Sequence, residues 1–172
     1  MYLPMRYSIF TIFLVMTISA LVAWRYSAYV NNPVLQLKTL GAGHQFVENE
    51  HHVVLGLGFD RSKMQRAVKL IGEMKRPCSI SITGNTIKDA DLTVLDSIDN
   101  VPAIFFSRST ISNAGVLELA GIKCLKQVTI ENCMNVDNSG IVQLEKTRPR
   151  LIIKGWWIER QINGGPPTLT GR

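Results

Sequence analysis

The chain has 172 residues, a length that suits one modest domain with some additional segments. Its hydrophobic content of 46% is ordinary for a globular protein, and its formal charge of +6 points only weakly to an acidic partner or a membrane surface. The cysteines Cys78, Cys124 and Cys133 are odd in number and include no C-x-x-C pair, so the sequence supports no disulfide.

A stretch without charge lies near the amino terminus, between Arg6 and Arg25. Residues Tyr7–Trp24 are apolar and just long enough to span a bilayer as one helix. Their aromatic ends suit the membrane interface, where amphipathic rings are favoured. We therefore expect a short flank over residues 1–6 and an uncleaved, single-pass anchor over residues 7–24.

Two alternatives to an anchor stay open, a cleaved signal peptide and a buried helix. Signal-peptide cleavage favours small residues at positions −1 and −3. Cleavage after Ala23 would put Leu21 at −3, and cleavage after Ala20 would put Ile18 there, so neither site fits well. Basic residues are nearly balanced on the two sides of the stretch, which leaves the membrane orientation undecided.

Residues 25–52 are expected to form a connector with one short helix. Asn31-Asn32-Pro33 is a typical break. The following segment, Val34–Leu40, can make one or two helical turns, and Gly41 can end them.

An opening strand is expected over His51–Phe59. Its Leu55 and Leu57 are aligned with Ile80 and Ile82, 25 positions later. A helix is then expected over residues 62–74, with these residues facing inward: Ala67, Leu70, Ile71 and Met74. We interpret this segment as a degenerate first repeat, because terminal repeats have one face in solvent.

One pattern occurs three times between Pro77 and Lys154. Strand-like alternation in Ile80–Ile82 returns 24 positions later in Ile104–Phe106, and 24 positions after that in Val128–Ile130. After each strand come a turn, an Asp or Asn that can cap a helix, and apolar residues three apart. The expected caps are Asp89, Asn113 and Asn138. No unit alone can bury its apolar face, so we expect the units to stack around a shared core.

The second unit, Val101–Ile111, resembles the L-x-x-L-x-L-x-x-N-x-L signature of leucine-rich repeats. Thr86–Leu92 and Thr110–Val116 resemble the T-x-I-x-D-x-G-L turn of the short bacterial and ribonuclease-inhibitor-like repeats. The resemblance implies an α/β fold, a short leucine-rich-repeat solenoid with parallel strands on its concave side and helices on its convex side. Since this family binds many different molecules, it implies binding without naming the partner.

The repeat domain is expected over residues 53–158, with about four strand–helix units and a terminal strand at Leu151–Lys154. Trp156-Trp157-Ile158 is expected to cover the open end of the core. Residues 159–172 contain Gly164-Gly165-Pro166-Pro167 and no periodicity, and are expected to be a disordered tail.

Candidate chemistry is sparse. His44, His51 and His52 match no metal-ligand spacing, and adjacent strand residues point to opposite faces. A catalytic thiol needs a paired base, and the repeats contain no histidine. The chain has no G-x-S-x-G motif, and the G-x-G of residues 55–59 lacks its third glycine. We therefore expect no catalytic residue, cofactor or metal, and place an enzyme third among the possible functions.

The opening helix is rich in cations. Residues 61–76 contain one acidic residue, Glu73, and six basic residues: Arg61, Lys63, Arg66, Lys69, Lys75 and Arg76. Such a face can meet anionic lipid headgroups, and it can equally be an ordinary solvated surface. Nucleic acid is a poorer alternative, because aromatic residues are not interleaved with the cations. The candidate lipid-contact residues are Arg61, Lys63, Arg66 and Lys69.

The strand residues that point away from the core are the other candidate site. One outward row is expected to hold Gly56, Ser81, Phe105, Thr129 and Lys154. Phe105 is a large apolar residue at an open position, which suits a partner anchor, unless a loop or Trp156-Trp157 covers it. The candidate partner-binding residues are Phe105, Arg108, Gln127, Thr129, Glu131 and Trp156.

These observations favour a non-catalytic, membrane-anchored module for protein–protein interaction, whose partner and oligomeric state stay open. The alternatives are a structural or envelope protein that associates with itself, and a peripheral contact with the lipid surface through residues 61–76.

Overall fold

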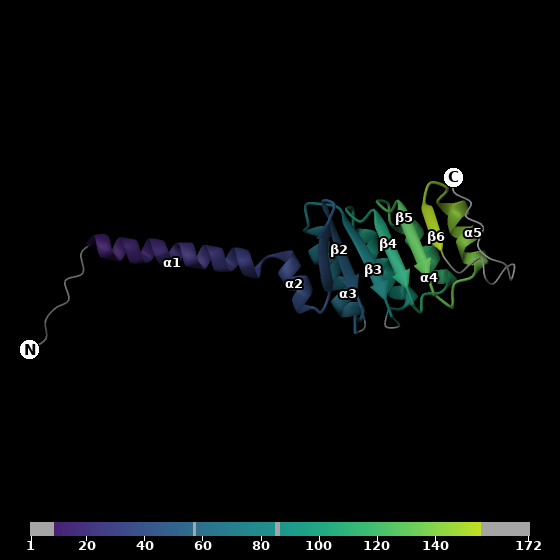
Figure 1. Cartoon of the computed structure of the whole chain (residues 1–172), viewed down its shortest axis with the longest axis horizontal. Coiled ribbons are helices and arrows are strands. Elements are labelled where there is room, and N and C mark those ends of the chain that lie inside the picture. The colour runs from purple at the N-terminus through teal and green to yellow at the C-terminus, as the bar shows by residue number, and fades with distance from the viewer. Residues whose placement is uncertain (1–8, 57, 85–86, 156–172) are drawn as a thin grey trace, which may run out of the picture.

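A computed structural model describes residues 9–56, 58–84 and 87–155. The chain has an α/β fold in which a mixed six-stranded sheet follows an amino-terminal apolar helix (Figure 1). The elements in order are α1 (Ile9–Val30), α2 (Pro33–Thr39), β1 (Gly43–Val47), β2 (Glu50–Leu55), α3 (Arg61–Gly72), β3 (Cys78–Thr83), η1 (Asp89–Ser97), β4 (Ala103–Ser107), α4 (Asn113–Glu118), η2 (Leu119–Gly121), β5 (Gln127–Glu131), α5 (Asn138–Thr147) and β6 (Ile152–Gly155).

The strands lie in chain order, from β1 to β6. β1 and β2 form an antiparallel hairpin, and every later neighbour is parallel. Ile80 pairs with Ile104, and Ile104 pairs with Val128, so the register follows the 24-residue step of the sequence. In Figure 1 the labelled strands succeed one another along the long axis, from β2 on the side of α1 to β6 at the far end.

The core lies between the sheet and the helices that connect its strands. The alternating strand residues Ile80, Ile82, Ile104, Phe106, Val128 and Ile130 are all buried, and so are the helical residues Leu92, Leu95, Val116, Leu119, Ile141 and Leu144. The inward positions expected in the opening helix are buried as well. The alternation of period two and the helical spacing are thus confirmed as the two sides of one core.

α1 is exposed along its described side chains and is long and apolar enough to cross a membrane; a signal sequence meets the same criteria. The helix continues past the expected end at residue 24 and stops at Val30. α2 follows after two residues, with Asn32 as its cap and Pro33 in its first turn. Gly41 has a φ of 88°, a left-handed conformation that suits glycine where a helix ends, as expected.

The connector contains an element that the sequence analysis missed. Residues 43–55 form a hairpin whose turn, Glu48-Asn49, has φ values of 50° and 72°. Tight hairpin turns require such angles, but their usual marker is Asn-Gly or Asp-Gly, which is absent here. The expected boundary at residue 52 therefore falls inside β2.

The register of the opening strand differs from the expected one by two residues. Val53 pairs with Ile80 and Leu55 pairs with Ile82, so Val54, not Gly56, lies beside Ser81. Leu57, which we had aligned with Ile82, lies outside the described residues, as do residues 1–8 and the expected tail. Paired residues of β2 and β3 are 27 positions apart, so the 24-residue step of the later strands does not extend to β2, which is preceded by the hairpin strand β1.

The helix caps lie one residue before the expected positions, at Lys88, Ser112 and Asp137. The side chains of Asp89 and Asn113 reach across to the next unit instead. Asp89 accepts hydrogen bonds from the backbone N–H of Ser112 (2.9 Å) and from its hydroxyl (2.5 Å). Asn113 accepts one from the N–H of Asp137 (2.9 Å) and donates one to its carboxylate (2.9 Å). We call these contacts the helix-start row.

Glycines make room for the helix-start row. A Cβ atom on Gly115 would lie 2.3 Å from Oδ1 of Asp89, and one on Gly140 would lie 2.3 Å from Oδ1 of Asn113. Both distances are far below van der Waals contact, so Gly115 and Gly140 allow the preceding unit to approach.

A second row of contacts, the helix-end row, is formed by Asn100, Cys124 and Arg148, which are 24 positions apart. The amide of Asn100 donates to the carbonyls of Ile71 and Met74. The thiol of Cys124 donates to Ile98 and Val101, and the guanidinium of Arg148 donates to Ala120, Ile122 and Leu125. Cys124 is thus a hydrogen-bond donor to carbonyls that follow the preceding helix.

Candidate functional site

The face of the sheet opposite the helices brings together most of the residues expected to bind a partner. Phe105 pairs with Thr129, and Gln127 and Glu131 flank Thr129 on the same strand face. Phe105, Gln127 and Glu131 are half-buried, so their side chains retain contact with solvent. The structure therefore joins these residues into one continuous surface, which we call the open sheet face.

Thr129 does not fit the expectation that it is exposed. It is 7% exposed, and its Oγ1 atom is buried with no hydrogen-bond partner among the described residues. The side chains beside it in the sheet are the bulky Phe105 and Lys154. The Thr129 side chain points to the expected face of the sheet. It is shorter than its neighbours Phe105 and Lys154, however, so little of its surface is accessible to a partner.

Arg108 lies beyond the end of β4 in an unusual backbone conformation. Its φ is 52°, a left-handed value that is uncommon for a residue with a long side chain. Gly84 and Asn132, 24 positions away on either side, have φ values of 92° and 53° and follow β3 and β5 in the same way. The N–H of Arg108 donates to the carbonyl of Glu131 (2.9 Å), which fixes the turn on the next strand.

The three turns share a geometry that glycine and asparagine adopt more readily than arginine. An arginine there costs on the order of 1 kcal/mol. Backbone strain of this kind is found at functional sites, where the side chain that it positions has a use. The exposed side chain of Arg108 is therefore a candidate for binding.

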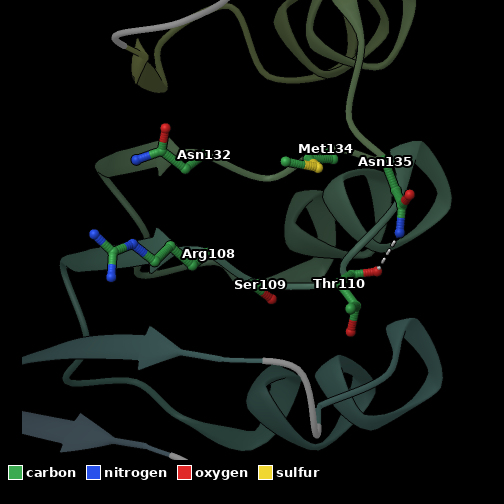
Figure 2. Close-up of a pocket in the computed structure, with 6 residues that line it drawn as sticks. All are labelled: Arg108, Ser109, Thr110, Asn132, Met134 and Asn135. Carbon is green, nitrogen blue, oxygen red and sulfur yellow. Dashed lines mark hydrogen bonds between the residues drawn. The ribbon is translucent and has the colours of Figure 1, made fainter.

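A hollow of about 570 Å³ opens beside this turn, at the carboxyl ends of β4 and β5. We call it the strand-end hollow. Figure 2 shows Arg108 and Asn132 projecting from the ends of neighbouring strands, with Met134 and Asn135 on the loop that follows. The amide of Asn135 donates to the carbonyl of Thr110 (3.2 Å), which ties the two loops together. The six lining residues are Arg108, Ser109, Thr110, Asn132, Met134 and Asn135.

The lining combines a guanidinium, two side-chain amides, two hydroxyls and a thioether, and includes no carboxylate. Met134 is 93% exposed, which makes it an adaptable apolar contact at the rim. Such a surface can receive an acidic or amide side chain and an apolar group beside it. Among these six, only Arg108 was identified from the sequence. From Val128 to Val136 the third copy has one residue more than the second copy has from Ile104 to Ile111. This insertion near Cys133-Met134 was the available signal for Asn132, Met134 and Asn135, because insertions in repeats often form loops on one face, whereas nothing marked Ser109 and Thr110.

Two of the cysteines, Cys78 and Cys133, lie in surroundings that disfavour the thiolate. Burial raises the pKa of the Cys78 thiol to about 12, and burial also raises the pKa of the Cys133 thiol. Both thiols are therefore protonated at neutral pH, while a nucleophilic cysteine needs the thiolate. Within residues 9–56, 58–84 and 87–155, no group of three or more His, Cys, Asp or Glu side chains could hold a metal ion.

Two histidines meet across the amino-terminal hairpin. Nε2 of His44 lies 2.8 Å from Nδ1 of His51, a contact that the sequence analysis missed because it missed the hairpin. The pKa of each imidazole is lowered, first by burial and then by positive charge, from His51 and Lys38 at His44 and from Arg76 at His51. The same cations make the pair a poor site for a metal ion.

The candidate lipid-contact residues of α3 separate into two pairs. Arg61 lies 3.9 Å from the carboxylate of Asp91, and the Lys63 ammonium donates to the carbonyl of Gly58 (2.9 Å). Arg66 and Lys69 are exposed and line a different hollow, between α3 and the start of α2. Trp156, the remaining candidate partner residue, lies outside the described residues.

Comparison with known protein families and with curated proteins found no match for this chain.

Proposed function

We propose that the chain is a non-catalytic, membrane-anchored module for protein–protein interaction, built on short leucine-rich repeats. The repeat assignment is supported by parallel strands that pair in register every 24 residues. It is also supported by a turn, a cap and a helical segment after each of β3, β4 and β5. In this proposal the sheet is the inner wall of a short solenoid.

The anchor is α1, which has no buried residue in the span Thr11–Val30. An apolar helix of this length is stable when lipid surrounds it. Carbonate extraction tests the assignment: the full-length chain should stay with the membrane pellet. Release into the supernatant, or an amino terminus that begins after residue 20, would rule the anchor out.

One observation carries the binding role, the strained Arg108 turn beside the open sheet face. Phe105 supplies an aromatic anchor, and the strand-end hollow supplies a cation and amides at its edge. An aromatic residue surrounded by polar groups is typical of an interface centre. We infer that the partner presents an apolar side chain to Phe105 and an acidic or amide group to Arg108.

Arg108→Gly separates binding from folding. Glycine adopts the left-handed turn without strain, so the variant should be as stable as the natural chain or more stable by about 1 kcal/mol. The guanidinium is lost, however, and capture of the partner should fall at least tenfold. A photoreactive residue placed at Gln127 in the full-length chain would capture the partner, and mass spectrometry would identify and count it.

Val142→Ala is the matched control, because Val142 is an exposed apolar residue on α5, in the helical layer. It should capture the partner normally, whereas Phe105→Ala should not. If the Arg108→Gly and Phe105→Ala variants both still capture the partner, the proposed binding site is wrong. If the captured molecule is a second copy of this chain, the self-association alternative is correct instead.

A further inference from the structure

A second surface lies at the amino-terminal end of the domain, where the turn between α1 and α2 faces α3. Arg66, Lys69, Leu70 and Glu73 of α3 and its end face Asn31 and Gln36 across a hollow of about 430 Å³, which we call the junction hollow. We propose that the junction hollow binds the phosphate of an anionic phospholipid headgroup in the membrane that α1 crosses. The inference rests on α1 being an anchor and is independent of the partner site at Phe105 and Arg108.

The depth of the junction hollow agrees with a headgroup. α1 has 22 residues, and at 1.5 Å per residue it is about 33 Å long, a few Å more than the hydrocarbon core. If Trp24, just before Arg25, marks the edge of that core, Asn31 lies seven residues farther, or about 10 Å, just outside the headgroup layer, which extends roughly 5–7 Å beyond the core. The long side chains of Arg66 and Lys69 can extend from there toward the phosphates.

The junction is held by hydrogen bonds, so the hollow stays beside the membrane end of α1. The amide of Gln36, in α2, donates to the carbonyl of Val30, the last residue of α1 (3.2 Å). The N–H of Gln36 donates to the carbonyl of Asn32 (3.1 Å), and Oδ1 of Asn32 accepts from the N–H of Val34 (2.9 Å). α2 in turn buries Leu37 completely in the core, which joins the anchor to the folded domain.

The charges around the junction hollow suit an anion. Arg66 and Lys69 are three positions apart on α3, so they share one helix face. Among the described residues, neither lies within ion-pairing distance of a carboxylate, although Glu73 is at the edge of the hollow. Arginine binds phosphate through paired N–H groups, and lysine adds a point charge.

The surroundings add features of a membrane interface. Tyr29 and Val30 line a neighbouring hollow together with Lys38, which is exposed at the end of α2. Trp24, Tyr26 and Tyr29 are exposed at the same end of α1. Aromatic rings and basic side chains gathered beside the last turns of an apolar helix are typical of the headgroup region.

The structure also supplies the control for this proposal. Arg61 and Lys63 are on the same helix but at its other end, and they are held by Asp91 and by the carbonyl of Gly58. Arg66→Gln with Lys69→Gln and Arg61→Gln with Lys63→Gln remove the same charge from α3. Only the first pair should change headgroup contact, whereas a general attraction to the membrane would respond to both.

The test uses the full-length chain in phosphatidylcholine vesicles that contain either a phosphatidylglycerol or a phosphatidylcholine analogue with a photoreactive headgroup. After illumination, labelled peptides from residues 31–40 and 61–75 are counted by mass spectrometry. Phosphatidylglycerol should label both segments, and the Arg66/Lys69 double variant should reduce this labelling roughly tenfold, as expected for two basic residues at a charged surface. The Arg61/Lys63 variant should differ less than twofold from the natural chain.

Equal labelling by the phosphatidylcholine analogue, or an equal loss in the two double variants, would overturn the proposal. A parallel sample with a photoreactive acyl chain labels α1 if the helix is in the membrane. Labelling of α1 without labelling at residues 31–40 and 61–75 would show that the anchor holds and the headgroup site is wrong. Absence of both would show that the anchor itself is wrong.

Discussion

The helix-start row and the helix-end row both connect neighbouring units, but they use different chemistry. At the helix starts, side-chain oxygens of Asp89 and Asn113 accept hydrogen bonds from the backbone of the next unit. At the helix ends, side chains of Asn100, Cys124 and Arg148 donate to carbonyls of the preceding unit. Helices leave free N–H groups at their starts and free carbonyls at their ends, which explains the direction of each row.

The two rows differ in how strictly they restrict residue type. The helix-start row needs a short acceptor opposite a glycine, because a Cβ on Gly115 or Gly140 would collide with it. The helix-end row needs only a donor at a given position, and an amide, a thiol and a guanidinium all meet that need. A geometric role can therefore recur at a constant step while the residue that fills it changes.

The largest effect is expected where the helix-end row uses a charged donor. Arg148→Ala should lower the free energy of unfolding by about 3 kcal/mol, because three half-buried carbonyls lose a cationic donor. Chemical denaturation of the full-length chain in detergent measures this. Arg150→Ala, at an exposed position two residues later, should change stability by no more than about 0.5 kcal/mol. If both variants lose the same stability, the row contributes nothing.

A methyl group in the helix-start row should have the next largest effect. Gly115→Ala places a Cβ on the Asp89 carboxylate and should cost about 2 kcal/mol. Gly72→Ala is the matched control, since a Cβ there meets nothing within 4 Å, and it should stabilise α3 by about 0.5 kcal/mol. Adding Asp89→Ala to Gly115→Ala should cost little more than Asp89→Ala alone, because the collision is then removed.

Cys124 tests whether the helix-end row depends on a donor or on packing. Cys124→Ser keeps a donor toward Ile98 and Val101 and should alter stability by no more than about 0.5 kcal/mol. Cys124→Ala removes the donor and should cost about 1 kcal/mol. Equal stability of the alanine and serine variants in urea would assign Cys124 to packing alone.

The smallest effect concerns pH at the exposed end of the helix-start row. Hydrogen bonds from Ser139 and then from Asn113 lower the pKa of Asp137 to about 2, below the ordinary value of 3.8. A lowered pKa means that the ionised carboxylate stabilises the fold above about pH 4 and that this contribution disappears as the pH falls through about 2. Asp137→Asn should flatten the stability profile in that window, and an NMR titration of Asp137 checks the pKa directly.

Features that follow from repeated residue types could be predicted from the sequence alone. The strand alternation predicted the buried positions from Ile80 to Ile130, and the structure confirms them. The hairpin of β1 and β2 was not readable, because its turn has Glu48-Asn49 where Asn-Gly would have marked it. The helix caps were displaced by one position because Asp and Asn can serve either their own helix or the next one.

In the candidate site, too, some features could be predicted from the sequence and others could not. Phe105, Gln127 and Glu131 were grouped correctly from strand period alone, since alternate residues share a sheet face. The burial of Thr129 depends on the sizes of the side chains on both neighbouring strands. The strand-end hollow depends on a left-handed arginine, which has no sequence marker, and on a loop that the sequence marks only by one extra residue.

The sequence by itself determined the period, the order of the elements from β3 onward, the apolar amino-terminal helix and the inward faces of β3, β4 and β5. These follow from local rules, because side-chain direction alternates along a strand and recurs every turn of a helix. Only the tertiary structure decided which polar side chain meets which backbone group 24 residues away. A hydrogen bond requires a donor and an acceptor about 3 Å apart, and that distance is set by how the units stack rather than by either residue. The basic residues of α3 show the same limit. The sequence presents them as one basic helix, and only the structure shows that Arg61 and Lys63 contact Asp91 and Gly58 while Arg66 and Lys69 line the junction hollow.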